Sequence, residues 1–406
     1  MIIINKKMGR KCLLMHKLGI SVYPDIKPLE EIKEYFKLAS NYGCKVVFSS
    51  MFSVEGTKEE VLNYFREMNK AVHDYGMQVS LDVNPECMNR LGATPEDISV
   101  FHEIKTDILR MDLSYGLEKD LKLLQNPYGI LIEFNASIIK PDYLGELIDH
   151  GANPDRILVC HNFYPQRYTG MKWQKFLEIN KEFKKHGVTV GAFISSNQKE
   201  THGVWDAICG LCTVEKHRGL PIDLQLRELL ATGNVDTVLI GNAYASEEEF
   251  MSMQEVVKPV EINFDNPIAR MIGLDKQDDK GYARQKKIKV ILDEGISDIE
   301  KDVLFNFVPH CDVGDSSEWI WRSRMPRFIY KDKTIPVRKN DLPVFKRGSV
   351  VMVNDAYKHY AAEVQIVLKD IVNDGTRNVV GYLDSQEIEM LELIQDFDIV
   401  VFLEHK

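Results

Sequence analysis

The feature that most constrains the fold is an alternation of short apolar runs with longer amphipathic segments over the first 255 residues. The short runs have the length and the β-branched content of buried strands. There are eight of them, at residues 18–23, 45–49, 78–83, 108–113, 130–134, 157–160, 189–194 and 237–240. Between them, segments such as 28–42 and 58–75 repeat Leu, Ile and Phe at spacings of three and four, as helices packed on a sheet do.

Glycines mark the ends of several expected helices. Gly43, Gly76, Gly151 and Gly187 each follow a helical segment and precede a strand, which suits a left-handed C-terminal cap. Eight strand–helix units in about 240 residues match a (β/α)₈ TIM barrel. A doubly wound sheet often carries a Gly-rich phosphate turn, and no G-x-G-x-x-G follows the first run. We therefore predict an α/β fold with a TIM barrel over residues 17–255, preceded by a tail at 1–16.

The pattern changes after residue 255. Residues 256–264, 349–353, 363–368, 377–382 and 399–403 read as short strands without long helices between them, and 385–394 reads as one helix. This pattern predicts a smaller, β-rich second domain over residues 256–406.

Charge and cysteine content exclude several classes of protein. The net charge of −10, from 51 basic and 61 acidic residues, disfavours binding to nucleic acid. Seven scattered cysteines indicate a reducing compartment. We see neither a leader-like apolar segment nor a run of about 18 apolar residues, so we expect a cytoplasmic location and no membrane partner. Cys209 and Cys212 lack the further ligands of a zinc site, and we expect no metal and no cofactor.

The barrel prediction locates the chemistry, because residues at the C-terminal ends of the strands meet at one mouth. Polar and aromatic candidates there are Tyr23, Asp25, Phe52, Asp82, Asp112, Glu133, Asn135, His161, Asn162 and Tyr164. The long connection after the seventh strand adds Glu215, Lys216, His217 and Arg218, an acid beside three potential cations. Each of these residues has a structural alternative, as a hydrogen-bonding group of the rim or a solvated helix start.

Several of these segments resemble the 6-phospho-N-acetylmuramidase family. The resemblance rests on L-G-I-S-V-Y-P-D, D-V-N-P-E, R-M-D-L-S-Y-G, E-F-N-A-S, H-N-F-Y-P…T-G and T-V-E-K-H-R-G-L-P in the barrel, and on N-D-A-Y-K-H-Y-A-A-E-V-Q-I-V-L-K-D and N-V-V-G beyond it. It implies a cyclophilin-like C-terminal domain. It also implies hydrolysis of the β-1,4 bond between N-acetylmuramic acid 6-phosphate and N-acetylglucosamine, in cytoplasmic recycling of cell-wall sugars. The expected partner is thus a phosphorylated amino-sugar disaccharide.

Glycosidic cleavage commonly uses two carboxyl groups. We nominate Asp112, which Arg110 on the same side of the strand would keep ionised, and Glu215 as the proton donor. Asp82 and Glu133 are the substitutes. An alternative is attack by the sugar's own acetamido group, with one acid and an orienting residue such as Asn135.

The remaining candidates would bind substrate. Arg218, His217 and the cluster of Arg322, Ser323 and Arg324 suit the phosphate and the lactyl carboxylate. Tyr23, Phe52 and Tyr164 could pack on sugar rings. Two other classes stay open, a sugar-phosphate isomerase or aldolase and a non-catalytic carbohydrate-binding protein. No lysine stands at the strand ends considered, which counts against a Schiff-base aldolase.

Overall fold

The computed structural model describes residues 16–24, 26–51, 54–205, 209–260, 285–307 and 309–405. Asp25, Phe52 and residues 261–264 of the apolar run after 255 therefore lie outside the described residues. The chain divides into two compact units, with the boundary between Val257 and Lys258.

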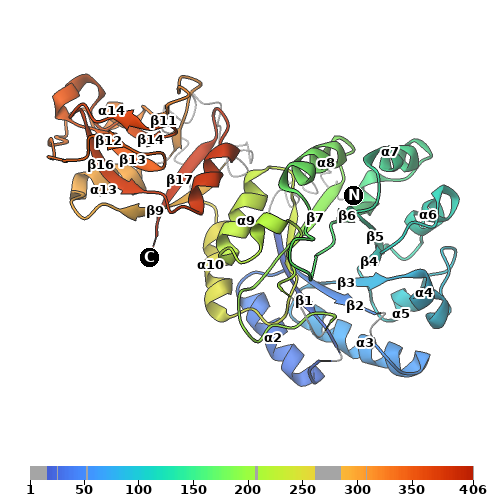
Figure 1. The fold of residues 1–406 in the computed structure, drawn as a ribbon. Coiled ribbons are helices and arrows are strands. Elements are labelled where there is room, and N and C mark those ends of the chain that lie inside the picture. Colours follow the sequence, from blue (N-terminus) through green and yellow to red (C-terminus); the bar gives the residue numbers. More distant parts are fainter. Residues whose placement is uncertain are drawn as a thin grey trace, which may run out of the picture. The chain divides into compact units, whose positions relative to one another are not determined.

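The first unit is a closed barrel of eight parallel strands with helices around it (Figure 1). Its strands are β1 (Lys17–Val22), β2 (Val46–Ser50), β3 (Gln78–Val83), β4 (Ile108–Met111), β5 (Leu131–Asn135), β6 (Ile157–Cys160), β7 (Thr189–Ile194) and β8 (Thr237–Ile240). The barrel closes where Lys17 pairs with Thr237. The predicted barrel and all eight strands are confirmed, with shifts of one or two residues at some ends.

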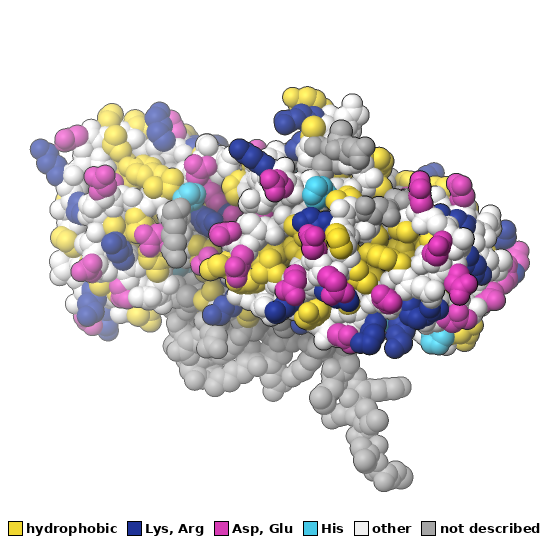
Figure 2. Space-filling model, turned by 90° about the horizontal axis from the view of Figure 1, so that it is seen from below, with side chains coloured by type: hydrophobic (Ala, Val, Ile, Leu, Met, Phe, Trp, Pro, Cys, Tyr) yellow, Lys and Arg dark blue, Asp and Glu magenta, His cyan; other side chains and the backbone are white. Residues whose placement is uncertain are grey.

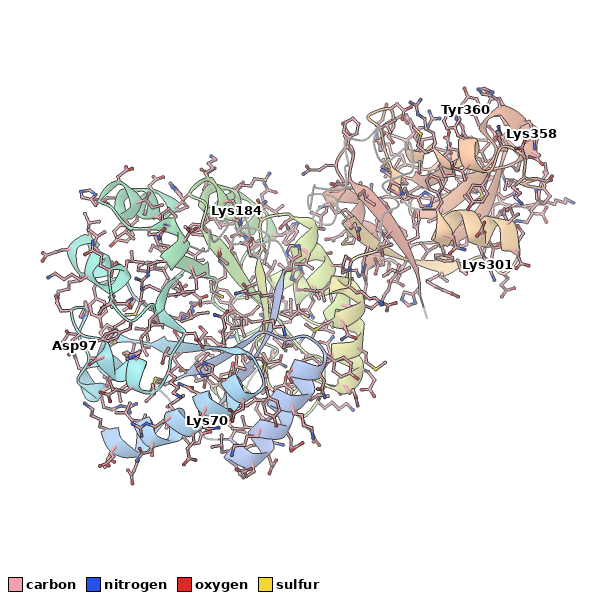
Figure 3. All side chains as sticks on the ribbon, turned by 180° about the vertical axis from the view of Figure 1, so that it is seen from behind. Lys70, Asp97, Lys184, Lys301, Lys358 and Tyr360 are labelled. Carbon is pink, nitrogen blue, oxygen red and sulfur yellow. The ribbon has the colours of Figure 1, made fainter. Side chains whose placement is uncertain are left out.

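Helices follow the strands in sequence. They are α2 (Leu29–Asn41), α3 (Lys58–Asp74), α4 (Pro85–Leu91), α5 (Ser99–Glu103), α6 (Leu117–Leu124), α7 (Pro141–Asp149), α8 (Trp173–Lys185), α9 (Ile222–Ala231) and α10 (Glu247–Val257), with 3₁₀ turns η1 (Pro154–Arg156) and η2 (Glu215–His217). The four predicted capping glycines all have positive φ, at 89° for Gly43, 71° for Gly76, 95° for Gly151 and 73° for Gly187. Figure 3 labels Lys70 on α3 and Lys184 on α8 in this outer layer, and Nζ of Lys184 lies 2.8 Å from Oδ2 of Asp236.

The barrel interior has an apolar part and a polar part. Val46, Phe48, Cys160, Phe193 and Leu239 form a buried cluster from β2, β6, β7 and β8. On β3, β4 and β5 the corresponding positions are charged, as described below. Side chains alternate across each strand, so this inner cluster is separate from the larger core between the sheet and the helices.

The second unit is the predicted β-rich part. Its strands are β9 (Gln285–Leu292), β10 (His310–Cys311), β11 (Ile320–Ser323), β12 (Val344–Phe345), β13 (Ser349–Val353), β14 (Val364–Val367), β15 (Ile371–Val372), β16 (Arg377–Tyr382) and β17 (Ile399–Glu404). Seven of them form a sheet in the order β10-β17-β9-β16-β13-β14-β11, and β12 pairs with β15.

The second unit also holds α13 (Asp298–Asn306), α14 (Pro326–Ile329) and the 3₁₀ turns η3 (Asp355–Tyr360) and η4 (Glu387–Leu393). The helix predicted at 385–394 is therefore a 3₁₀ segment, and α13, α14, β9 to β12 and β15 were not predicted.

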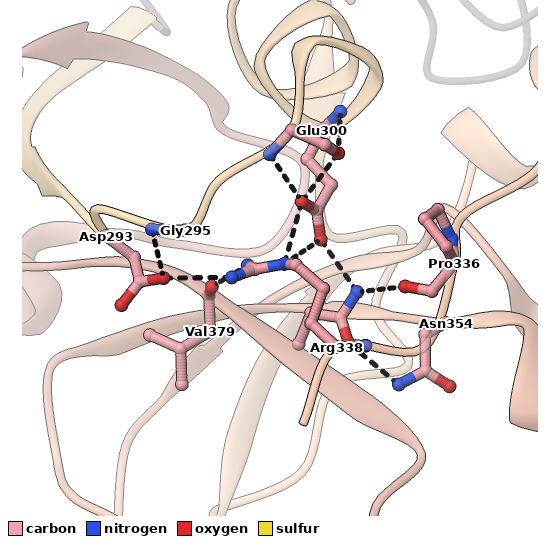
Figure 4. Close-up of polar contacts among 9 residues, drawn as sticks. Asp293, Gly295, Glu300, Pro336, Arg338, Asn354 and Val379 are labelled. Atoms are coloured by element: carbon pink, nitrogen blue, oxygen red, sulfur yellow. Dashed lines mark hydrogen bonds and ion pairs between the residues drawn. The ribbon is translucent and has the colours of Figure 1, made fainter. Parts of the chain in front are cut away.

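A polar network in the second unit surrounds the carboxylate of Glu300 (Figure 4). Arg338 pairs with Asp293 at 2.9 Å and with Glu300 at 3.1 Å. The amide of Asn378 donates to Glu300 and to the carbonyl of Pro336, each at 2.8 Å. Glu300 is fully buried, so these partners supply the compensation that a buried carboxylate needs.

On the face of the protein shown in Figure 2, basic and acidic side chains are interspersed, as its modest net charge of −10 leads us to expect. Hydrophobic side chains lie between them. No helix among the described residues combines the length and the apolar character needed to cross a bilayer.

Candidate active site

Strand register builds a charged cluster at the barrel mouth. Ser50, Asp82, Arg110 and Glu133 are successive partners across β2, β3, β4 and β5, so the four side chains lie side by side in one layer. All four are buried. The carboxylates of these adjacent strands converge as expected, and the strand register explains why they do.

Arg110 is the centre of the cluster. Its Nη1 lies 2.6 Å from Oδ1 of Asp82 and 3.9 Å from Oδ1 of Asp112. Its Nε lies 3.8 Å from Oε1 of Glu133, and its Nη2 donates to Oδ1 of Asn162 at 2.5 Å. Three carboxyl groups thus surround one guanidinium, and they come from three neighbouring strands and their ends.

The surroundings of Asp82 and Glu133 raise the pKa of both carboxyl groups. Burial raises the pKa of Asp82 to about 6 and that of Glu133 to about 7, against the opposing pull of Arg110. Neighbouring carboxylates add to both shifts, Asp112 to that of Asp82 and Asp82 to that of Glu133. Because a buried site resists accumulating negative charge, the cluster retains a proton near neutral pH.

Asp112 is the accessible acid of the site. Its side chain is 37% exposed, against 10% for those of Asp82 and Glu133. The amide of Asn135 donates to its Oδ1 at 3.1 Å and reaches its main-chain oxygen at 3.4 Å. Asn135 therefore fixes the orientation of this carboxylate.

A cavity of about 240 Å³ lies over the cluster. Its polar lining comes from Ser50, Asp82, Arg110, Asp112 and Asn162, and its apolar lining from Phe48, Phe163, Phe193, Val204 and Trp205. Phe163 packs edge-on against both Phe48 and Phe193, with ring centroids 6.1 and 4.9 Å apart. Paired acids beside aromatic rings are a suitable lining for a sugar, which presents both hydroxyl groups and apolar ring faces.

Glu215 does not fit the role of proton donor. Its carboxylate pairs with Arg218 through bonds of 2.7 and 2.8 Å, and it accepts from the backbone N–H groups of Tyr168 at 2.7 Å and Gly170 at 2.8 Å. These bonds, that from Arg218 foremost, lower its pKa to about 2, whereas we expected a raised value. Glu215 instead ties the loop after β6 to the connection after β7.

Arg218 is also occupied. Besides Glu215, its Nη1 donates to the main-chain oxygens of Cys209 and Gly210, at 2.8 and 3.2 Å. The expected grip of Arg218 on a phosphate would require breaking these contacts. Cys209 and Cys212 are both free thiols, and no cluster of three or more potential metal ligands occurs within the described part of the chain.

The two predicted histidines are buried away from the cavity lining. The imidazole of His161 is fully buried, donates from Nε2 to Oδ1 of Asn180 on α8 at 2.7 Å, and packs against Phe176. Burial lowers its pKa to about 4. His217 is equally buried, 3.0 Å from Oε2 of Glu228 on α9. Neither imidazole is placed for direct contact with a substrate, which corrects the expectation.

The other predicted residues occupy varied places. Tyr23 is buried and donates to the main-chain oxygen of Gly241, and Tyr164 is half-buried next to the cavity residue Phe163. In the second unit, Arg322 pairs with the buried Glu363, and Arg324 lies 2.9 Å from Asp315. Both arginines thus have acidic partners within their own domain.

Trp205 and Lys140, which were not predicted, also line cavities at the mouth. Neither stands at a strand end, so the rule used to find candidates could not select them.

Comparison with known proteins identifies the family. The family described as "6-phospho-N-acetylmuramidase, N-terminal" matches residues 18–255, and that described as "6-phospho-N-acetylmuramidase, C-terminal" matches residues 286–402. No curated protein gives a significant sequence match.

Two solved structures are similar over nearly the whole chain. The crystal structure of an uncharacterized B. cereus protein is 33% identical, with a TM-score of 0.81, and the match covers 96% of this chain and 100% of that one. The structure of a conserved Enterococcus faecalis protein is 23% identical, with a TM-score of 0.66 and 96% coverage of both chains, and it supports the fold. With both units matched by the same family, the chain belongs to the 6-phospho-N-acetylmuramidases, which are glycosidases.

Proposed function

We propose that the protein hydrolyses the β-1,4 bond between N-acetylmuramic acid 6-phosphate and N-acetylglucosamine. The observation that carries this proposal is the pair of carboxyl groups, Asp82 and Asp112, that line one cavity and share one nitrogen of Arg110. Two carboxyl groups in different environments are what acid-assisted glycoside cleavage requires.

We assign the proton donor to Asp82. Its raised pKa of about 6 keeps a fraction of the group protonated near neutrality, and it lines the cavity, whereas Glu133 is not among the lining residues. Protonation of the leaving oxygen by Asp82 would leave a carboxylate that Arg110 stabilises at 2.6 Å. Glu133 serves as a second store of the proton shared within the cluster.

Asp112 then acts at the anomeric carbon. Its exposed carboxylate is oriented by Asn135 and is available to stabilise positive charge that develops on the sugar ring. Water then adds to this carbon, and the proton that it releases returns to Asp82, which restores the donor. Asp112 and Asn135 could instead orient the acetamido group of the substrate. Substrate-assisted attack by that group is a variant of this scheme, and product stereochemistry is the observation that bears on it.

The proposed physiological setting is the recovery of cell-wall sugars in the cytoplasm. It is supported by the family and by six described cysteines that are all free thiols.

The test is to incubate the purified protein with the phosphorylated disaccharide and with its unphosphorylated analogue, and to measure released N-acetylglucosamine. We expect cleavage of the phosphorylated compound and much slower cleavage of the other. Asp112→Asn is the control for contaminating hydrolases. Cleavage of neither compound would overturn the proposal, and equal cleavage of both would overturn the requirement for phosphate.

A further inference from the structure

A second cavity, of about 260 Å³, shares Asp112 with the cavity over the charged cluster. Phe134, Ile138 and Ile139 make much of its wall, and Ile138 is 59% exposed. An isoleucine this exposed at the rim of a cavity offers apolar surface to a ligand. A substrate that reaches Asp112 therefore has space on it for a substituent with apolar character.

The polar wall of this cavity is rigid. The hydroxyl of Tyr143 donates to Oδ2 of Asp120 at 2.7 Å, and Ser114 donates to the same oxygen. The backbone N–H of Tyr115 donates to the other oxygen at 3.0 Å, and Asp120 is fully buried. Because the hydroxyl protons of Ser114 and Tyr143 are directed to Asp120, they do not serve as donors to an anion in the cavity.

Lys140 supplies the cation. Its side chain lines the second cavity, is exposed, and has no ion pair or hydrogen bond with any residue that the structure describes. Arg110, the other cation among the described residues lining the two cavities, is bonded to Asp82 and Asn162. An anionic ligand group at this mouth thus meets Lys140 as its available charge partner. Lys140 also stands at the cap position of α7, where the helix dipole favours an anion.

One cation on an apolar wall suits a particular substituent. A carboxylate next to a methyl group can pair with the ammonium while the methyl lies against isoleucine. A phosphate dianion fits less well, since phosphate sites usually combine several cations or backbone donors. The lactyl ether of a muramic acid residue carries such a carboxylate and such a methyl group.

We propose, as a deepening of the function proposed above and resting on it, that the cavity formed by Asp112, Phe134, Ile138, Ile139, Lys140 and Tyr143 binds the lactyl ether of the muramyl residue. Nζ of Lys140 pairs with the lactyl carboxylate, and Ile138 and Ile139 receive the methyl group. This contact distinguishes muramic acid from glucosamine, which has a hydroxyl group at the same carbon. Lys140 is therefore a specificity-determining residue, and it takes no part in the proton transfer.

The test uses Lys140→Met with two substrates, N-acetylmuramic acid 6-phosphate–N-acetylglucosamine and the matching diN-acetylchitobiose 6-phosphate, which lacks the lactyl group. We expect kcat/KM of the variant to fall about 10- to 100-fold on the muramyl substrate and less than about 3-fold on the other, as for loss of one charge-assisted bond. Lys175→Met, at an exposed lysine of α8, is the matched control and should behave as the wild type.

Other outcomes overturn the inference. An equal fall on both substrates would show that Lys140 does not read the lactyl group. If Lys140→Met lowered kcat/KM on the phosphorylated substrates but not on the unphosphorylated muramyl disaccharide, Lys140 would bind the phosphate.

If the wild type cleaves neither disaccharide, the proposed function fails separately. Calorimetric binding of N-acetylmuramic acid 6-phosphate and of N-acetylglucosamine 6-phosphate then still tests Lys140. A preference for the muramyl ligand that Lys140→Met abolishes supports the subsite, and no preference, or one that survives, refutes it.

Discussion

The substitution Glu215→Gln tests whether Glu215 has a structural role or a catalytic one. Glu215 accepts two bonds from Arg218 and two from backbone N–H groups, and its side chain is 26% exposed. A pKa of about 2 in the folded protein, against about 4.3 in an unfolded chain, corresponds to at most about 3 kcal/mol of stabilisation at neutral pH. Partial exposure and the acceptor that glutamine retains reduce the expected loss to about 1–2 kcal/mol.

The expected result is a modest loss of stability with activity preserved. About 1–2 kcal/mol corresponds to a fall in Tm of roughly 2–8 °C for a unit of this size. Because the folded pKa is depressed, the stabilisation is present above about pH 4.3 and is lost as the pH falls toward 2, so the two proteins should converge in acid. Urea unfolding followed by circular dichroism between pH 3 and 7, together with kcat on the phosphorylated disaccharide, measures both quantities.

A matched control is Glu103→Gln, at an exposed glutamate of α5 with no charged partner among the described residues. It should change neither stability nor kcat. If Glu215→Gln instead lowered kcat more than about 100-fold with unfolding unchanged, Glu215 would be the acid and our reasoning from its contacts would be wrong.

Three further changes test other parts of the structure. His161→Phe should weaken the decline in stability on acidification between about pH 6.5 and 4. Burial lowers the folded pKa of this imidazole to about 4, so the unfolded chain takes up the proton first. Urea titrations at several pH values measure the slope of stability against pH, and an unchanged slope would contradict the burial of His161. Gly170→Ala would place a methyl carbon 2.6 Å from Oε2 of Glu215, so we expect thermal unfolding to show a loss of stability of about 2 kcal/mol or more. The control Gly43→Ala, whose methyl carbon meets nothing within 4 Å, should lose about 1 kcal/mol. Equal losses in the two variants would contradict the close packing of Gly170 on Glu215. Arg110→Met leaves Asp82 and Glu133 without their cation, so we expect activity on the phosphorylated disaccharide to fall more than about 1000-fold and stability in urea to fall by about 3–5 kcal/mol. A fully active variant would refute the assigned role of this charged cluster.

The barrel was predictable because period and length are local properties of the sequence. The eight apolar runs and the capping glycines specify strands and helix ends without knowledge of distant contacts. Convergence of Asp82, Asp112 and Glu133 followed from the barrel, since strand ends meet at one mouth. In the second unit, two-residue strands such as His310–Cys311 have no period to detect, and they were missed.

Errors at the site have identifiable physical causes. Cys160 belongs to the barrel interior, so strand alternation turns the next residue, His161, outward to α8, and this signal was available in the sequence. The sequence held no such signal for the low pKa of Glu215, because this pKa depends in part on backbone donors at Tyr168 and Gly170, more than 40 residues away in the chain. Buried pairing of His217 with Glu228 similarly depends on how α9 packs.

The most direct test of the account is the pH dependence of kcat/KM for release of N-acetylglucosamine, compared between the wild type and Asp82→Asn. Since a donor must be protonated, the wild type should lose activity as the pH rises through an apparent pKa of about 6 to 7, the range of Asp82 and its partner Glu133. Asp82→Asn should lose at least about 100-fold in kcat/KM and should not show this decline. A variant with wild-type activity and the same alkaline decline would contradict the assignment of the chemistry to this cluster.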